Sequence, residues 1–241
     1  MAYQSVFKRY EIKFLLSAEQ YELVSSAMKP HMTPDAYGCT RICNIYYDTE
    51  NDRMIRASLE KPVYKEKLRL RSYGAAAQGS SIFVELKKKY NCIVYKRRLA
   101  MPEQEAKAWL SGGAAPVDSQ IAREITYVRD HYRDLRPKMH ISYLRQAWFG
   151  KDDRQLRITF DRDIQGRQEN LTLEADGGGF SVLDKDLVLM EVKTPGAIPL
   201  WLARVLTQNH IYKTSFSKYG TAYLKMLKGE WTNGNIVSGD F

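Results

Sequence analysis

Residues 67–71 read Lys-Leu-Arg-Leu-Arg and place a cation at every second position. Successive side chains of a β-strand point to opposite faces of its sheet, so this stretch predicts a strand with one cationic and one apolar face. Residues 84–89, Val-Glu-Leu-Lys-Lys-Lys, repeat the alternation, because Glu85, Lys87 and Lys89 share one face. Together the two stretches predict a sheet whose polar face is dominated by Lys and Arg.

The same alternation recurs in further stretches, at residues 10–14, 143–145, 156–161 and 190–193. Acid and base stand two residues apart in several of them, as in Glu11 and Lys13, which puts both on one face of the sheet. The predicted charged faces, which also hold Tyr143, carry the cations Lys13, Lys67, Arg69, Arg71, Lys87, Lys89, Arg145, Arg157 and Lys193 and the acids Glu11, Glu85, Asp161 and Glu191.

Two arrangements of the sheet are compatible with this pattern. An antiparallel sheet with one solvated side gives the same alternation and has no functional meaning. An ordinary solvated face, however, mixes Thr, Ser and Gln with charges of both signs, whereas Arg and Lys dominate here. If the sheet closes, its charged faces line one lumen, its apolar faces pack outward against helices, and no edge strand stays exposed. We therefore expect a closed antiparallel β-barrel with a basic interior.

Runs of strands interrupted by runs of helices, without strict βαβ alternation, predict an α+β chain. Ser17, with Gln20 three residues later, forms a capping-box signature for the first helix. The expected strands span residues 9–15, 41–48, 63–73, 81–89, 92–100, 138–149, 155–164 and 187–193. The expected helices span residues 17–28, 102–110, 118–131, 199–209 and 217–228 and pack outside the barrel. Residues 1–228 are expected to form one domain, followed by a loose tail over residues 229–241.

The chain of 241 residues contains 37 Lys and Arg against 28 Asp and Glu, a net charge of +9. Such a balance favours anionic partners and says nothing about the fold. The three cysteines form no CxxC pair, which argues against a disulfide framework or structural zinc and favours a reducing compartment. The first residues lack the apolar run of a signal peptide, and no stretch reaches about 18 apolar residues, so we expect a cytoplasmic protein without a transmembrane segment.

A cationic lumen favours a particular class of ligand. Like charges held in a restricted space repel one another, and a ligand with several negative charges relieves that repulsion. Arg forms paired hydrogen bonds with phosphate oxygens and Lys supplies point charges, so the expected ligand is a polyanionic phosphate compound. The carboxylates among the cations suit Mg²⁺ or Mn²⁺, which bind through carboxylates together with substrate phosphates and promote phosphoryl transfer.

Short motifs in a fixed order make the chain similar to a known family. They are RYEIKF (9–14), YYDT (46–49), KLRLR (67–71), VELKKK (84–89), SYLRQAW (142–148), LRITFDRD (156–163), LMEVK (189–193) and SFSKY (215–219). Together, over about residues 7–228, they resemble the VTC domain, the polyphosphate polymerase domain of the CYTH-like triphosphate tunnel metalloenzymes. The resemblance implies a tunnel-shaped barrel that transfers the γ-phosphate of ATP to a growing inorganic polyphosphate chain.

The resemblance also implies roles for individual residues. Catalytic roles on the reacting phosphates fall to Arg69, Arg71, Lys87, Arg145, Arg157 and Lys193. Substrate-binding roles fall to Glu11, Lys13, Lys67, Lys89, Tyr143, Ser217, Lys218 and Tyr219. Ser217 is the expected N-cap of the last helix, whose N-terminus favours phosphate. Glu191 is the implied ligand of Mn²⁺ or Mg²⁺. Asp161 is expected to pair with an Arg or to end a strand, and metal binding is the alternative role for it.

One departure from the wider superfamily bears on the reaction. The first strand of that superfamily often carries Glu-x-Glu-x-Lys, whereas residues 10–13 here read Tyr-Glu-Ile-Lys, so a second acidic metal ligand is missing. The departure favours a polymerase over a two-metal triphosphatase. Hydrolysis of triphosphate or polyphosphate and non-catalytic polyphosphate binding stay open. Nucleic-acid binding is disfavoured, because the cations converge instead of covering an open surface.

Overall fold

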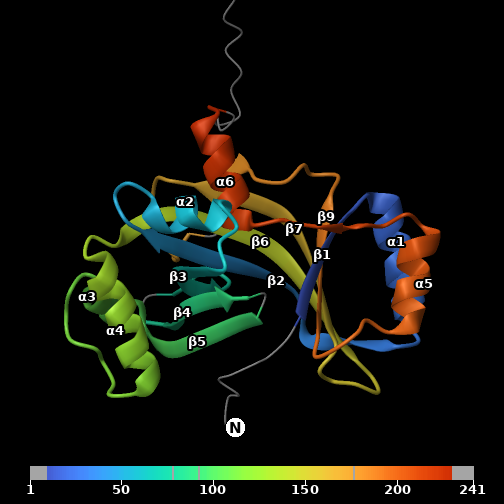
Figure 1. Cartoon of the computed structure of the whole chain (residues 1–241), viewed down its shortest axis with the longest axis horizontal. Coiled ribbons are helices and arrows are strands. Elements are labelled where there is room, and N and C mark those ends of the chain that lie inside the picture. The colour runs from blue at the N-terminus through green and yellow to red at the C-terminus, as the bar shows by residue number, and fades with distance from the viewer. Residues whose placement is uncertain (1–9, 78, 92, 176, 230–241) are drawn as a thin grey trace, which may run out of the picture.

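The structure is a computed structural model that describes residues 10–77, 79–91, 93–175 and 177–229. The strands are β1 (Tyr10–Leu16), β2 (Met32–Asp48), β3 (Tyr64–Tyr73), β4 (Ser81–Tyr90), β5 (Ile93–Pro102), β6 (Arg136–Gly150), β7 (Arg157–Arg167), β8 (Phe180–Ser181), β9 (Val188–Thr194) and β10 (Lys213–Thr214). The helices are α1 (Ala18–Met28), α2 (Arg53–Leu59), α3 (Glu103–Leu110), α4 (Gln120–Tyr132), α5 (Leu200–Gln208) and α6 (Lys218–Leu227), as Figure 1 shows. Arg9 and Cys92, predicted to begin strands, and residues 230–241 of the predicted tail lie outside the described residues.

One antiparallel sheet contains all ten strands, in the order β10-β1-β9-β7-β6-β2-β3-β4-β5, with β8 paired to β7. The predicted α+β class with an antiparallel sheet is confirmed. β2 and β6, with 17 and 15 residues, are the longest strands and pair along most of their length in the middle of the sheet. The two halves of the sheet therefore extend as arms from a common central pair.

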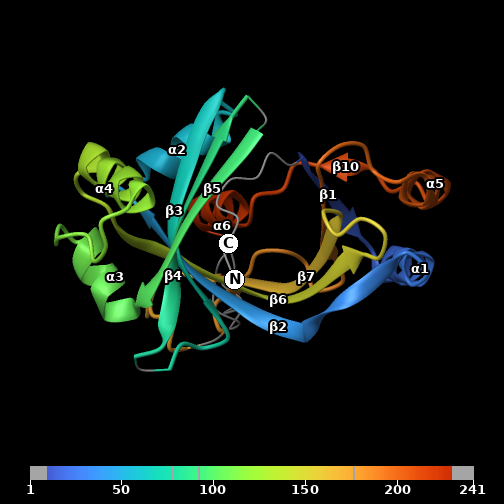
Figure 2. The same ribbon diagram turned by 90° about the horizontal axis from the view of Figure 1, so that it is seen from below.

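The sheet curls strongly (Figure 2). The apolar side chains of its two arms pack against helices on the convex face, so the charged side chains that alternate with them lie on the concave face. We expected a closed barrel, but within the described residues no backbone pairing joins β5 to β10 or β1. Side chains make the contacts instead: Lys87 Nζ of β4 lies 3.2 Å from Glu11 Oε2 of β1, and Lys67 Nζ of β3 donates over 2.8 Å to Ser217 Oγ, the N-cap of α6. β1 pairs with β9 along one edge and with the short strand β10 along part of the other. β10 therefore stands between β1 and the arm that ends in β5.

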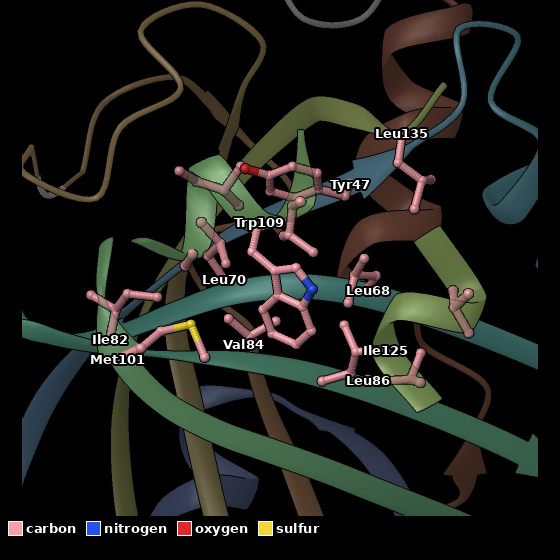
Figure 3. Packing of buried hydrophobic residues seen from close by; sticks show 14 of the residues in the cluster. Tyr47, Leu68, Leu70, Ile82, Val84, Leu86, Met101, Trp109, Ile125 and Leu135 are labelled. Carbon is pink, nitrogen blue, oxygen red and sulfur yellow. The ribbon is translucent and has the colours of Figure 1, made fainter. Parts of the chain in front are cut away.

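Helices cover both arms on the convex face. α1 and α5 pack over β1, β7 and β9, where Phe160 is buried beneath them. α3 and α4 cover β3 and β4, and Trp109 of α3 lies among Leu68, Val84 and Ile125 (Figure 3). The apolar faces predicted from the alternation are thus the buried ones. Within the described ranges, no helix combines the length and the hydropathy that crossing a bilayer requires.

The helix α6 departs from the expectation that every helix packs outside the sheet. It lies on the concave side of the sheet, called the hollow below, between the arm formed by β3, β4 and β5 and the opposite arm (Figure 2). Tyr219 and Tyr223 of α6 are buried with Tyr46 and Tyr143 of the concave face, and the rings of Tyr46 and Tyr219 stack with their centroids 4.7 Å apart. The helix fills part of the hollow and brings its N-terminus to the charged side chains.

The helix α2 was not predicted, because its capping signal lies well before its first residue. Its N-cap, Asp52, has a left-handed backbone (φ 58°) and makes no side-chain capping bond. The carboxylate of Asp48, at the end of β2, accepts hydrogen bonds from the backbone N–H groups of Thr49, Met54 and Ile55, over 2.8 to 2.9 Å. The predicted capping box of Ser17, by contrast, is present in full.

The strand β2 begins at Met32, earlier than the predicted residue 41. Its first part contains Pro34 and Gly38 and shifts register against β6 between Pro34 and Cys39. These residues are typical of turns, and they conceal the strand from a reading based on alternation.

Candidate functional site

Glu85 of β4 is the centre of a first charged cluster on the concave face. Arg69 and Arg71 approach it from β3, at 2.7 and 3.6 Å, and Lys96 and Arg98 approach it from β5, at 2.5 and 4.0 Å. Strand register creates the cluster, since Arg69 and Arg98 are the cross-strand partners of Glu85. Burial works to raise the pKa of Glu85, but Arg71, Arg69 and Lys96 outweigh it and hold that pKa well below its usual range.

Glu191 of β9 is the centre of a second cluster. Its Oε1 lies 3.4 Å from Lys13 and 3.3 Å from Lys218, and its Oε2 lies 3.0 Å from Lys193 and 3.4 Å from Arg145. Burial favours a higher pKa for this carboxyl, but the cations, with Lys218 contributing most, hold the pKa well below its usual range. Glu191 is therefore ionised and shared among four cations at neutral pH.

Asp161 of β7 fixes two of these cations in place. Arg145 donates from Nε and Nη2 to its two carboxylate oxygens, each over 2.6 Å, and Lys218 Nζ lies 2.5 Å from Oδ2. Asp161 is fully buried, and the paired hydrogen bonds hold the guanidinium plane in one orientation. The expected pairing of Asp161 with an Arg is thus present, and its partner also contacts Glu191.

Tyr143 of β6 joins the two clusters. Its hydroxyl accepts a hydrogen bond from Arg71 Nη2 over 3.1 Å, while Arg145 and Lys218 lie 5.1 and 4.5 Å from the centre of its ring. Burial works to raise the pKa of this phenol, but Arg145, Arg71 and Lys218 prevail, and the pKa lies below its usual value. The clusters therefore form one continuous electropositive surface.

The first turn of α6 brings three predicted residues to the hollow in different ways. Ser217 caps the helix, since its Oγ accepts from the backbone N–H of Gly220 over 3.1 Å. Lys218 enters the second cluster. Tyr219 lies deeper, because its hydroxyl donates to Asp48 Oδ2 over 3.2 Å and its ring stacks on Tyr46.

The remaining predicted residues lie around the clusters. Arg157 and Lys193 are cross-strand partners on β7 and β9, and the guanidinium of Arg157 lies 5.0 Å from the centre of the Phe149 ring. Lys67, Lys87 and Lys89 lie on the β3–β4 pair. Burial, together with Lys87 and Lys13, lowers the pKa of Lys67 to about 7.

Sequence reasoning missed four side chains of the site. Lys96 and Arg98 flank Arg97, and three successive cations conceal the alternation that singles out the other strands. On β2, Tyr46 accepts from Arg69 and Asn44 accepts from Arg71, each over 2.8 Å. The available signal was the two-residue period of Asn44, Tyr46 and Asp48 along β2. Asn44 and Tyr46 are uncharged, however, and Asp48 resembles a turn residue.

Two carboxylates have the chemistry and the placement for a divalent metal. Glu191 and Glu11 both lie against the ammonium of Lys13, at 3.4 and 3.5 Å, so they face a common point. Among the described residues, no group of three or more metal-ligating side chains gathers. Mg²⁺ and Mn²⁺ bind readily through one or two carboxylates with phosphate oxygens completing the shell, and Glu191 with Glu11 fits that pattern.

Comparison with solved structures shows a shared fold at low sequence identity. A candidate adenylate cyclase from Bacillus halodurans superposes with a TM-score of 0.55 at 15% identity, covering 89% of this chain and 96% of its own. A candidate adenylyl cyclase from Hippeastrum, described as having a dominant triphosphatase activity, gives a TM-score of 0.53 at 16% identity, covering 92% and 95%. No curated protein matches the chain in sequence.

The sequence itself matches one family over nearly its whole length. Residues 8–227 correspond to the VTC domain, and this range includes both carboxylate-centred clusters and the N-terminus of α6. The chain therefore belongs to the VTC domain family.

Proposed function

We propose that this protein is a polyphosphate polymerase, which transfers the γ-phosphate of ATP to the end of an inorganic polyphosphate chain. The observation that carries the proposal is the presence of two adjacent cation clusters, centred on Glu85 and Glu191, on one concave face of a VTC domain. Transfer between two phosphate compounds requires that a donor and an acceptor phosphate be held side by side, and two linked clusters supply such positions.

In the proposed reaction, an oxygen of the chain's terminal phosphate attacks the γ-phosphorus of ATP. A new P–O bond forms while the bond from the γ-phosphorus to the bridging oxygen breaks, and ADP leaves with that electron pair. The terminal phosphate is ionised near neutral pH, so the nucleophile needs no general base.

The side chains that contact the transferring phosphate must be fixed before the reaction begins. Arg145 and Lys218 are held by Asp161, and Arg69 and Arg71 are held by Glu85. Such preorganised cations stabilise charge that develops in the transition state without reorientation at the moment of reaction.

Mn²⁺ or Mg²⁺ is the implied cofactor, and Glu191, with Glu11 beside it, would hold the ion. A bound ion would supply Lewis-acid neutralisation of the β- and γ-phosphate oxygens. The carboxylates have a second effect in the absence of nucleotide, because they keep Lys13, Lys193 and Arg145 in the hollow.

The direct test is to incubate the purified protein with ATP and Mn²⁺ or Mg²⁺ and to resolve the products on a polyacrylamide gel. The proposal predicts long-chain polyphosphate together with ADP. Release of orthophosphate alone would mean that water is the acceptor, as in a triphosphatase. Unchanged ATP with every metal tried would leave a non-catalytic polyphosphate-binding domain as the better description.

A Glu191→Gln variant tests the role of the second cluster. We expect turnover to be abolished, while affinity for polyphosphate is retained or rises, because a carboxylate that competes with phosphate for four cations is neutralised. Glu124→Gln is the matched control, since Glu124 pairs with Lys88 and Arg97 away from the hollow. Calorimetry of polyphosphate binding beside the gel assay measures both effects. Equal loss of binding and turnover would show that Glu191 is structural.

A further inference from the structure

Two aromatic side chains interrupt the charged rows on the concave face of β3 and β4. The concave positions of β3 hold Lys and Arg as far as residue 71 and then Tyr73, whereas those of β4 begin with Phe83 and continue with Glu and Lys. Ile82 and Val84, on either side of Phe83, are buried on the convex face, so Phe83 faces the hollow. Both aromatic residues lie beside the loop that joins β3 to β4, at the lower end of these strands in Figure 2.

The two rings form a group with one guanidinium, that of Arg98 on β5. We call Tyr73, Phe83 and Arg98 the stacking group. The centroids of the two rings lie 5.8 Å apart with their planes at 85°. The guanidinium of Arg98 lies over the Phe83 ring, 3.9 Å from its centroid. Tyr73 is 53% exposed, so much of its ring is accessible to a ligand.

The stacking group borders the first cation cluster. Arg71 lies directly opposite Phe83, and Arg98 lies directly opposite Glu85. Arg71 and Arg98 lie 3.6 and 4.0 Å from the carboxylate oxygens of Glu85. A step of two residues along a strand covers about 7 Å, and Phe83 lies one such step from Glu85. Cations and stacking surfaces therefore stand side by side, with a separation comparable to that between the phosphates and the base of a nucleotide.

The chemistry of the stacking group suits the base of a nucleotide. Bases stack on aromatic rings and on the plane of an Arg guanidinium, and they do so whatever their identity, because every base has a π-face. The cations of the two clusters attract phosphate, and they act alike on tripolyphosphate and on the triphosphate of a nucleotide. The stacking group supplies a contact that only the nucleotide can make.

We propose that Tyr73, Phe83 and Arg98 form a nucleobase subsite, on which the base of a nucleoside triphosphate stacks while the first cluster holds its phosphates. The role of that nucleotide as the phosphate donor rests on the proposed polymerase function. The subsite itself rests on the stacking group, and its test measures binding without turnover.

The test compares ATP with inorganic tripolyphosphate in calorimetric titrations at one fixed concentration of Mg²⁺. Tyr73→Leu removes a stacking ring, and Arg98→Lys keeps the positive charge but removes the planar guanidinium. We expect each substitution to weaken ATP binding by about fivefold or more and to change the affinity for tripolyphosphate by less than about twofold.

The matched control is Tyr90→Leu, at the other end of β4. It makes the same chemical change as Tyr73→Leu at a ring of similar exposure, 55% against 53%. The affinities of this variant for ATP and for tripolyphosphate should both equal those of the wild type. A selective loss of ATP affinity in Tyr90→Leu as large as in Tyr73→Leu would contradict the assignment of the subsite to this end of the strands.

A second series varies the base. Stacking on a larger ring system is stronger, so the wild type should bind ATP and GTP more tightly than CTP and UTP. The difference between purine and pyrimidine nucleotides should shrink in Tyr73→Leu. A difference of the same size in the variant and the wild type would count against stacking on Tyr73.

The affinity for tripolyphosphate also reports whether a variant is folded, because it requires an intact phosphate site. Unchanged ATP affinity in both variants, or equal weakening for both ligands in variants whose melting temperature equals that of the wild type, would overturn the subsite. Selective weakening of ATP in a protein that makes no polymer from ATP would support the subsite and contradict the polymerase proposal, so the two proposals fail separately.

Discussion

The ammonium of Lys67 lies where β3 meets the first turn of α6. It donates to Ser217 Oγ and is surrounded by Lys87, Lys13, Lys65 and Arg69, with a pKa of about 7. A lysine with that pKa changes its charge within the range in which cells operate. We therefore expect phosphate affinity at this point of the hollow to depend on pH in a way that an ordinary lysine would not cause.

A Lys67→Arg variant should remove this dependence. As pH rises through about 7, Lys67 loses its proton and wild-type affinity for tripolyphosphate should weaken relative to the variant, whose guanidinium stays charged. Calorimetric titrations from about pH 6 to about pH 8 measure the ratio of the two affinities, in which the ionisation of the ligand itself cancels. A ratio that does not change with pH would show that Lys67 is fully protonated throughout.

Single residues were predictable where a strand alternates cleanly. Arg69, Glu85 and Glu191 each follow from the two-residue period. Lys96 did not, because Arg97 and Arg98 follow it directly and remove the contrast between faces. Which carboxylate pairs with which cation depends on the register between strands, and the sequence of a single strand does not determine that register.

At the scale of elements, Asp48 connects three pieces of structure. It ends β2, accepts from the backbone at the start of α2, and receives the hydroxyl of Tyr219 from α6. The resemblance to the family included residues 46–49 as a motif and gave Asp48 no role. The capping role of Asp48 depends on the reversal of the chain between β2 and α2. Secondary-structure propensities do not reveal that reversal, so α2 was not predicted.

The matched variants Asp48→Asn and Asp52→Asn make the same chemical change at two acids that precede the first residue of α2. Asp48→Asn turns an NH₂ group toward buried N–H donors and should lower the free energy of unfolding by about 2–3 kcal/mol. Asp52→Asn removes an ion pair with Lys138 and should cost less than about 1 kcal/mol. Urea denaturation measures both. Similar losses would mean that Asp48 is not the effective cap of α2.

At the scale of the whole molecule, the two arms of the sheet are joined across the hollow by side chains such as Lys87 and Glu11, and no backbone pairing joins them among the residues that the structure describes. The alternation of charged and apolar residues predicted a sheet with a charged inner face and an apolar outer face. Whether the sheet closes into a barrel was not predictable, because closure depends on where β10 and α6 lie. A two-residue strand such as β10 carries no sequence pattern.

A polyanion that contacts both arms should stabilise the folded protein. Tripolyphosphate at about 100 times its dissociation constant should add about 2.7 kcal/mol to the free energy of unfolding and raise the melting temperature. Differential scanning fluorimetry measures the shift, with sodium chloride at equal ionic strength as the control. An identical shift with chloride would show that screening, and not binding between the arms, relieves the repulsion.

The position of β5 at one end of the sheet, as far as the described ranges show, affects how copies of this protein behave together. An exposed edge strand is a template on which a second chain can add, and natural proteins protect such edges with charge. Lys96, Arg97 and Arg98 stand in succession on this edge, so two copies that approach edge to edge would oppose six cations. Two of these cations, Lys96 and Arg98, also contact Glu85 on the concave face, so the same row of side chains links that cluster to the protection of the sheet edge against association.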